Sequence, residues 1–276
     1  MKRLGLVLAL LLLTGCNLVK LGYSQADRLI SWELDRYFDL DNQQEDQADQ
    51  IAQRLVTWHK TTQLPQYAAL TRAVDAALAA GQAPQAVAAA WTVYPKLRDQ
   101  LIRQASLEVA GLLVRLNPSQ LKHLKAKLAE ENHKMAEELA QPWAERQQER
   151  EEKILESFET WLGDLSQPQT LEIQTFLASQ PDLEPQRLAF RQEMQALFLS
   201  RLSPRASAPE VANLLFALMT PRDPAHPYAQ ALAASSQAWQ GFLGRFLSRL
   251  SPSQATHLRN KLQEALDLLT ELQGLT

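Results

Sequence analysis

Cys16 is the residue whose context most clearly predicts chemistry, and it is the only cysteine in the chain. It follows two basic residues, an apolar segment at residues 4–13, and the small residues Thr14 and Gly15. A basic start, an apolar core and small residues at the cleavage point are the parts of a secretory signal peptide. With cysteine directly after that point, the pattern is the lipobox of bacterial lipoproteins, in which the thiol receives a diacylglyceryl group. Residues 1–15 are therefore predicted to be a lipoprotein signal peptide, with Cys16 as the acylated N-terminus.

Two alternatives for this segment are an ordinary cleaved signal peptide with an incidental cysteine and an N-terminal membrane anchor. The apolar stretch is shorter than the roughly 20 residues that a membrane-spanning helix needs. That length favours the lipoprotein over the anchor.

The residue after the cysteine predicts the location. Aspartate at this position retains bacterial lipoproteins in the inner membrane, so Asn17 predicts the outer membrane, with the protein on its periplasmic face. Residues 16–22 are predicted to be a lipidated tether before the first helical pattern, which begins near Tyr23. At ~3.6 Å per residue at most, such a tether keeps the folded domain close to the bilayer. The lipid bilayer is thus the first predicted partner, through acylated Cys16.

The composition is that of a folded protein, with 46% hydrophobic and 21% charged residues among 276. Removal of Lys2 and Arg3 with the signal peptide changes the net charge from −3 to −5, which argues against nucleic acid as a partner. Because there is no second cysteine, an internal disulfide is excluded and stability must come from packing.

The predicted fold is all-α, because apolar residues recur at intervals of three and four along the chain. Helices are predicted at residues 23–38, 42–61, 65–80, 84–116, 118–140, 142–163, 167–179, 184–202, 208–219, 224–250 and 252–273. Pro95 and Pro142 should kink or break their helices, since each removes a backbone donor. We expect a helical bundle of about ten helices. It forms one domain at residues 23–276, or two halves at about 23–163 and 184–276.

One helix-turn-helix hairpin occurs twice, at an offset of 134 residues between positions 115–128 and 249–262. Each copy reads Arg-Leu, then Asn or Ser, then Pro-Ser-Gln, with His-Leu and Lys-Leu following. Asn117 and Ser251 stand where a helix N-cap is expected, and glutamine follows three residues later, as in a capping box. Duplication and convergence on one favourable junction both explain the repeat.

No group of residues has the spacing of a catalytic or metal site. The five histidines show neither H-E-x-x-H nor a close pair at helical spacing, and the chain has no glycine-rich phosphate loop. We therefore predict no enzyme activity and no cofactor. His123 and His257 are expected to pack at the repeated hairpin turn, and Trp143 is the tryptophan expected to be exposed.

Several segments near the N-terminus resemble an uncharacterised family of bacterial lipoproteins. The resemblance rests on a lipobox followed by Tyr23-Ser24-Gln25-Ala26-Asp27, Trp32, Tyr37-Phe38-Asp39-Leu40-Asp41, Trp58-His59 and Leu64-Pro65-Gln66-Tyr67. It implies a helical lipoprotein and brings no known activity with it. The aromatic and acidic residues in this region form the candidate binding set, namely Tyr23, Asp27, Asp35, Trp58, His59 and Tyr67. The alternative is that they form a hydrogen-bonded first layer of the bundle.

A second, local resemblance concerns the helix starts. Leu116-Asn117-Pro118-Ser119-Gln120, Leu165-Ser166-Gln167-Pro168-Gln169 and Leu250-Ser251-Pro252-Ser253-Gln254 are similar to the L-T-x-x-Q motif of Spy-type periplasmic chaperones. This resemblance implies a binding or chaperone-like role in the envelope, with a periplasmic or outer-membrane protein as partner. A capping box alone also explains the motif. The alternative functions are an envelope hydrolase acting on peptidoglycan and a carrier of a small apolar ligand.

Overall fold

The structure is a computed structural model that describes residues 16–202, 206–220 and 223–274. Within these ranges the chain forms helices and no strand, which confirms the predicted all-α class. The predicted signal peptide, residues 1–15, lies outside the described residues.

The first part of the chain contains α2 (Cys16–Ser24), α3 (Ala26–Phe38), α4 (Asn42–Trp58), the π-helical turn η1 (His59–Gln63), α5 (Leu64–Ala79), α6 (Ala83–Leu113) and α7 (Pro118–Ala140). The second part contains α8 (Trp143–Leu162), α9 (Gln167–Ala178), α10 (Glu184–Arg201), α11 (Ala208–Met219), α12 (Pro227–Leu247) and α13 (Pro252–Gly274).

The start of the helical body differs from the prediction. The chain is already helical at Cys16, and a turn at Gln25 separates α2 from α3, where one helix at 23–38 was predicted. Val19 is 7% exposed and belongs to a cluster of buried apolar residues with Leu64 and Leu272. The segment predicted to be a lipidated tether, residues 16–22, is thus helical, and its Val19 packs on the body. The physical reason is an apolar face on α2 that the body buries.

The two prolines singled out in the sequence behave differently. Pro142 separates α7 from α8, as predicted. Pro95 lies inside α6, which continues unbroken from Ala83 to Leu113. A proline removes one hydrogen bond from the helix, but α6 packs against α4, α5, α11 and α12 along its length. These neighbours hold the helix together across Pro95.

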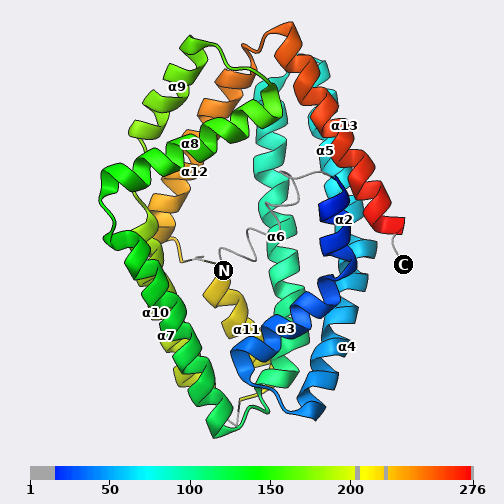
Figure 1. The fold of residues 1–276 in the computed structure, drawn as a ribbon, viewed down its shortest axis with the longest axis vertical. Helices are drawn as coiled ribbons and strands as arrows, with labels where there is room; N and C mark the ends of the chain where they lie inside the picture. Colours follow the sequence, from blue (N-terminus) through cyan, green and yellow to red (C-terminus); the bar gives the residue numbers. More distant parts are fainter. Residues whose placement is uncertain (1–15, 203–205, 221–222, 275–276) are drawn as a thin grey trace.

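The helices close into an elongated frame in which α6 runs along the long axis (Figure 1). Helices from the two predicted halves pack directly on one another, because α5 contacts α13, α7 contacts α10, and α6 contacts α12. The turns between α6 and α7 and between α12 and α13 lie at opposite ends of the long axis (Figure 1). The repeated hairpin therefore occupies both ends of the molecule.

Three apolar clusters form the core. The first joins α3, α4, α6, α7, α10 and α11, and the second joins α8, α9, α12 and α13 around stacked phenylalanines. The third is the smaller cluster where α2 packs on α5 and α13. Among the described residues, no helix combines the length and the apolar character required to cross a membrane.

Candidate functional site

The repeated hairpin contributes to two similar sites, which we call the first junction (residues 36–47 and 111–123) and the second junction (residues 160–172 and 245–257). At the first junction Gln120 is 2% exposed, and its Nε2 donates to the carbonyl oxygen of Asp39 at 2.8 Å. Its Oε1 accepts from the backbone N–H of Asn117 at 3.0 Å. The amide also exchanges hydrogen bonds with the amide of Gln44, in the first turn of α4. One buried glutamine thus ties three chain segments together.

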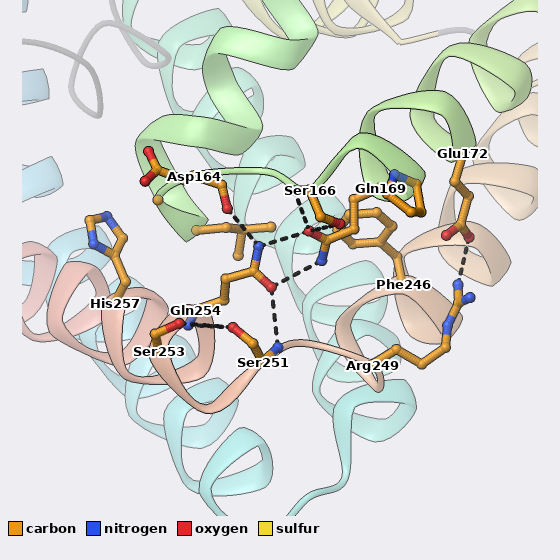
Figure 2. A pocket seen from close by; sticks show the side chains of 13 residues that line it. Asp164, Ser166, Gln169, Glu172, Phe246, Arg249, Ser251, Ser253, Gln254 and His257 are labelled. Atoms are coloured by element: carbon orange, nitrogen blue, oxygen red, sulfur yellow. Dashed lines mark hydrogen bonds and ion pairs between the residues drawn. The ribbon is translucent and has the colours of Figure 1, made fainter.

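The second junction repeats this arrangement. Gln254 is 6% exposed, its Nε2 donates to the carbonyl oxygen of Asp164 at 2.9 Å, and its Oε1 accepts from the backbone N–H of Ser251 at 3.1 Å. Its partner amide is that of Gln169, with N···O distances of 2.9 and 3.0 Å (Figure 2). The glutamines of both hairpins are therefore structural ties.

Two further contacts are repeated. His123 Nε2 lies 3.1 Å from the carbonyl oxygen of Arg36, and His257 Nε2 lies 3.2 Å from that of Thr160. Lys127 and Lys261 each donate to the glutamate three residues later at 2.8 Å. The prediction that both histidines pack at the hairpin turn is confirmed.

The sequence also contains a second half of this repeat, which the sequence analysis missed. Asp39-Leu40-Asp41 with Gln44 corresponds to Asp164-Leu165-Ser166 with Gln169, at an offset of 125 residues. In each segment the glutamine Oε1 accepts from the backbone N–H of the capping residue, at 3.0 and 2.9 Å. The pattern Asp-Leu-(Asp/Ser)-x-x-Gln, which occurs at both places, is the sequence signal for this second half of the repeat.

The two junctions differ at the turn that precedes this cap. Asp39 follows α3 with φ 51°, whereas Gly163 follows α8 with φ 76° and ψ −158°, a conformation open essentially to glycine. The second junction also has one more residue between the helix end and the next N-cap. The His257 ring lies 3.7 Å from the place where a side chain on Gly163 would begin. Glycine is therefore needed at this turn for its backbone conformation.

A groove of about 800 Å³ opens at the second junction between the starts of α9 and α13. Figure 2 shows the amides of Gln254 and Gln169 at its centre, with His257 on one side and the Glu172–Arg249 ion pair on the other. The ion pair measures 2.5 Å. At the first junction Arg115 instead donates to the neutral Gln47 at 2.8 Å. The arginine of the second junction is therefore paired with a carboxylate, whereas the arginine of the first junction is bonded to a neutral amide.

Three of the six candidate residues near the N-terminus come together where α2 packs on the body, in a group that we call the α2 site (Tyr23, His59, Gln63 and Tyr67). Tyr23 Oη and His59 Nδ1 are 2.9 Å apart, and the rings of His59 and Tyr67 are 6.0 Å apart. Burial lowers the pKa of His59 to about 4 and raises the pKa of Tyr67 to about 12, with a small further rise from Tyr94. Burial also raises the pKa of Tyr23.

The α2 site contains the π-helical turn η1, in which the backbone N–H of Leu64 bonds the carbonyl oxygen of His59. Gln63 is fully buried, and its Nε2 donates to Gln100 at 3.2 Å. Its Oε1 and the hydroxyl of Tyr67 are buried side-chain atoms for which the described residues supply no hydrogen-bond partner. π-helical turns within helices are frequent at functional sites.

The other three candidate residues have different surroundings from the α2 site. Asp35 Oδ1 accepts from the backbone N–H of Leu40 at 3.0 Å and so closes the end of α3. Asp27 accepts from the backbone N–H of Arg28 at 2.8 Å in the first turn of α3. Trp58 lines a shallow surface pocket on α4. The structure therefore does not bring the six residues into one site.

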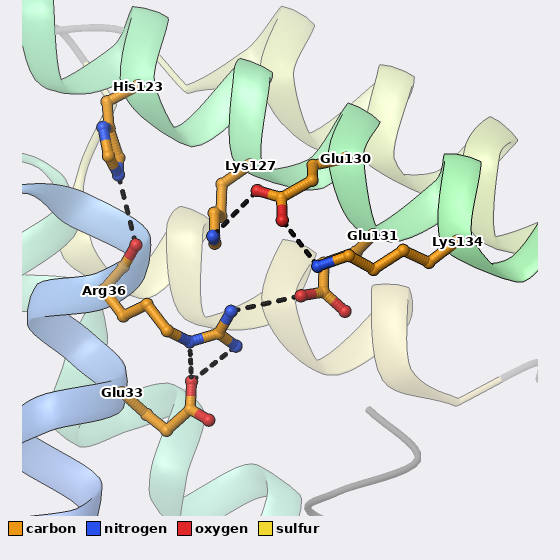
Figure 3. Close-up of polar contacts among 7 residues, drawn as sticks. All are labelled: Glu33, Arg36, His123, Lys127, Glu130, Glu131 and Lys134. Atoms are coloured by element: carbon orange, nitrogen blue, oxygen red, sulfur yellow. Dashed lines mark hydrogen bonds and ion pairs between the residues drawn. The ribbon is translucent and has the colours of Figure 1, made fainter.

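A charged cluster joins α3 to α7 (Figure 3). Arg36 pairs with Glu33 at 2.7 Å and with Glu131 at 3.1 Å. Burial opposes the charge on Arg36, but the hydrogen bonds to both glutamates outweigh it and raise the pKa of Arg36. Hydrogen bonds from Lys127 and Lys134 lower the pKa of Glu130 to about 2. Every charge in this cluster has a partner, so the cluster is a structural clamp.

Comparison with known proteins gives a family and no activity. Residues 36–225 match a family of unknown function, DUF6279. The chain belongs to this family. The match covers the first junction and ends before α12. No curated protein and no solved structure matches the chain. Among the described residues, no group of three or more histidine, cysteine, aspartate or glutamate side chains is arranged to hold a metal ion.

Proposed function

We propose that this DUF6279 protein is an envelope lipoprotein, acylated at Cys16 and held on the periplasmic face of the outer membrane, that binds polypeptide and catalyses no reaction. The observation that carries the proposal is the position of α2, which begins at Cys16 and is packed on the body. Acylation would therefore attach the lipid to the folded protein with no flexible linker between them.

Several contacts hold α2 in place. Val19 is buried against the body, Lys20 forms an ion pair with Glu271 of α13, and Tyr23 is hydrogen-bonded to His59. Two or more acyl chains give stable attachment where a single chain gives only marginal binding. The protein would thus be a fixed body at the membrane surface, where exported polypeptides pass.

The groove at the second junction supports polypeptide binding. Its volume of about 800 Å³ lies within the ~300–1,000 Å³ of most ligand pockets. It is open to solvent, and its exposed lining includes the hydroxyls of Ser166 and Ser253 and the carboxylate of Asp164. Such donors and acceptors suit the backbone of an extended peptide. A purely apolar ligand would cover the charged carboxylate of Asp164 without offering it a hydrogen bond, which makes the carrier function less suitable.

The resemblance to Spy-type chaperones adds little support, because the structure gives its motif a local cause. In each of the three motifs the glutamine Oε1 accepts from the backbone N–H of the capping residue. A helix start alone explains this spacing. The proposal therefore rests on α2 and on the groove.

Suppression of client aggregation by purified residues 17–276 tests the binding function. We expect weak suppression that Ser253→Trp removes, because the indole would fill the groove. The matched control is Ser119→Trp, which changes the corresponding exposed serine of the first junction and should keep the suppression. Suppression that is absent in the wild type, or that survives Ser253→Trp, would contradict binding through the groove.

The same preparation is incubated with peptidoglycan sacculi to test the enzyme alternative. We expect no release of muropeptides. Clear release would replace the binding function with a hydrolase.

A further inference from the structure

The exposed apolar side chains of the molecule are concentrated next to α2. The large apolar residues that are exposed in the described part of the chain are Leu21, Leu29, Trp32, Tyr94, Leu107, Trp143, Leu171, Leu197 and Leu232. Three of these nine lie between positions 21 and 32, on α2 and the first two turns of α3. The exposed fractions there are 61% for Leu21, 49% for Leu29 and 55% for Trp32.

The placement of these residues on α3 follows from its helical register. Ile30, Leu34 and Tyr37 pack against the first core cluster and define the inner face. Leu29 and Trp32 are three residues apart, so they share a face of the helix, and both are exposed. The outer face of α3 is therefore apolar at its centre, although it faces solvent.

Basic residues flank this apolar surface. Arg28 is exposed next to Leu29, and the guanidinium of Arg36, which is paired with Glu33 and Glu131, lies 5.7 Å from the centre of the Trp32 ring. Tryptophan with neighbouring basic residues is typical of side chains at a membrane–water interface, where the ring lies at the level of the headgroups.

The predicted acylation of Cys16, the first residue of α2, indicates the occupant of this surface. The described residues begin at Cys16, which the sequence predicts to be acylated, and α2 is packed on the body from Val19 onward. Acyl chains at Cys16 would therefore enter the bilayer from the start of the helix that also carries the exposed Leu21. A soluble partner would have to compete with that bilayer for the same side of the molecule.

From these observations we infer that Leu21, Leu29 and Trp32 form a membrane-contact surface that lies in the leaflet holding the acyl chains and fixes the orientation of the body. This inference rests on the proposed acylation of Cys16. It goes further, because acylation attaches the body to the membrane without specifying which of its side chains contact the lipid.

Tryptophan quenching by brominated lipids tests this inference on the full chain. The protein is purified from membranes and reconstituted into vesicles of phosphatidylethanolamine and phosphatidylglycerol with brominated acyl chains. We expect partial quenching, close to the share of one tryptophan among six. Trp32→Phe should abolish this quenching, because Trp32 is the tryptophan placed in the lipid.

The chain offers a matched control in Trp143→Phe. Trp143 is also exposed, at 38%, and its ring also lies near an arginine, with Arg146 at 5.1 Å. It is the first residue of α8, and α8 and α2 belong to different sides of the frame (Figure 1). Quenching should persist in Trp143→Phe. Its loss there, or its persistence in Trp32→Phe, would overturn the inference.

A second pair of variants keeps all the tryptophans. Leu29→Glu should reduce the quenching, since a carboxylate on this face opposes contact with lipid. Leu107→Glu changes a leucine of α6 that is 54% exposed and should leave the quenching unchanged. Equal quenching in both variants would contradict the proposed surface.

Acyl labelling of each preparation separates this inference from the proposed function. An acylated wild-type protein that shows no quenching would overturn the membrane-contact surface and leave the lipoprotein function in place. A wild-type protein that carries no acyl label would overturn both.

Discussion

The junctions and the α2 site both bury polar side chains, but they differ in how those side chains are satisfied. At the junctions, Gln120 and Gln254 each bond a backbone carbonyl, a backbone N–H and a second amide. At the α2 site, a buried oxygen of Gln63 and the hydroxyl of Tyr67 have no partner among the described residues. Burial also disfavours the charged form of His59.

This difference distinguishes polar residues that build the fold from polar residues that are candidates for a function. A hydrogen-bond set that occurs twice in one chain, at both ends of the frame, is explained by the helix junctions that it builds. Buried polar groups without partners cost stability and each needs its own explanation. The α2 site, together with the features found at only one junction, is therefore where function is to be sought.

The largest expected effect is a pH dependence that arises at the α2 site. His59 has a folded pKa of about 4 against an ordinary value of 6.5, so the unfolded chain binds more protons between these pH values. Stability from this residue is fully present above pH 6.5 and is lost as the pH falls toward 4. The loss should approach about 3 kcal/mol.

Urea melts at pH 7 and pH 4.5 measure this effect. His59→Gln should remove most of the difference between the two pH values. His133→Gln, which changes an exposed histidine of α7, should keep it. An unchanged pH dependence in His59→Gln would show that the α2 site does not control acid stability.

The next effect concerns the glutamines that tie the junctions. Gln120→Ala and Gln254→Ala each remove a buried amide that bonds a backbone carbonyl, a backbone N–H and a second amide, and we expect losses of about 2 kcal/mol in the free energy of unfolding. Because the junctions lie at opposite ends of the frame (Figure 1), the double variant should show near-additive losses. Chemical denaturation checks both points, and a loss at one junction alone would break the equivalence between them.

The helix caps should give a smaller effect. Asn117 Oδ1 accepts from two backbone N–H groups, of Ser119 and Gln120, whereas Ser251 Oγ accepts from one, that of Gln254, at 3.2 Å. Loss of a cap costs about 1 kcal/mol. Asn117→Ala should therefore cost somewhat more than Ser251→Ala. If neither variant shifted the denaturation midpoint, these residues would not stabilise their helices as caps.

The smallest effect is expected from Tyr67→Phe. The hydroxyl of Tyr67 is buried without a partner, so its removal should be neutral or slightly stabilising, in contrast to the glutamine variants. A thermal melt at neutral pH measures this. A marked fall in stability would mean that the hydroxyl has a partner, such as a bound water, and would remove the difference between the two regions.

Much of the fold could be predicted from the sequence, because its signals are local. The all-α class, the break at Pro142 and the caps at Asn117 and Ser251 follow from residue spacing and helix-end chemistry. The continuity of α6 through Pro95 could not be predicted in this way, since it depends on neighbouring helices.

The candidate sites were harder to predict from the sequence, because they are formed by contacts between distant segments. The sequence indicated Tyr23, His59 and Tyr67, but their contact depends on how α2 packs against η1 and α5. The π-helical turn at His59–Gln63 joins α4 to α5 without a break, where the sequence predicted two separate helices. The groove was not predicted, because it forms between α9 and α13, whose starts are more than 80 residues apart in the chain.

The central claim is that the chain is anchored by lipid at Cys16, and metabolic labelling with a fatty acid tests it most directly. Labelled acyl chains should appear on the wild-type protein, which should sediment with the outer membrane. The Cys16→Ser variant should carry no label and should leave the membrane fraction. A label that persists on Cys16→Ser, or a wild-type protein that carries no label, would contradict the account.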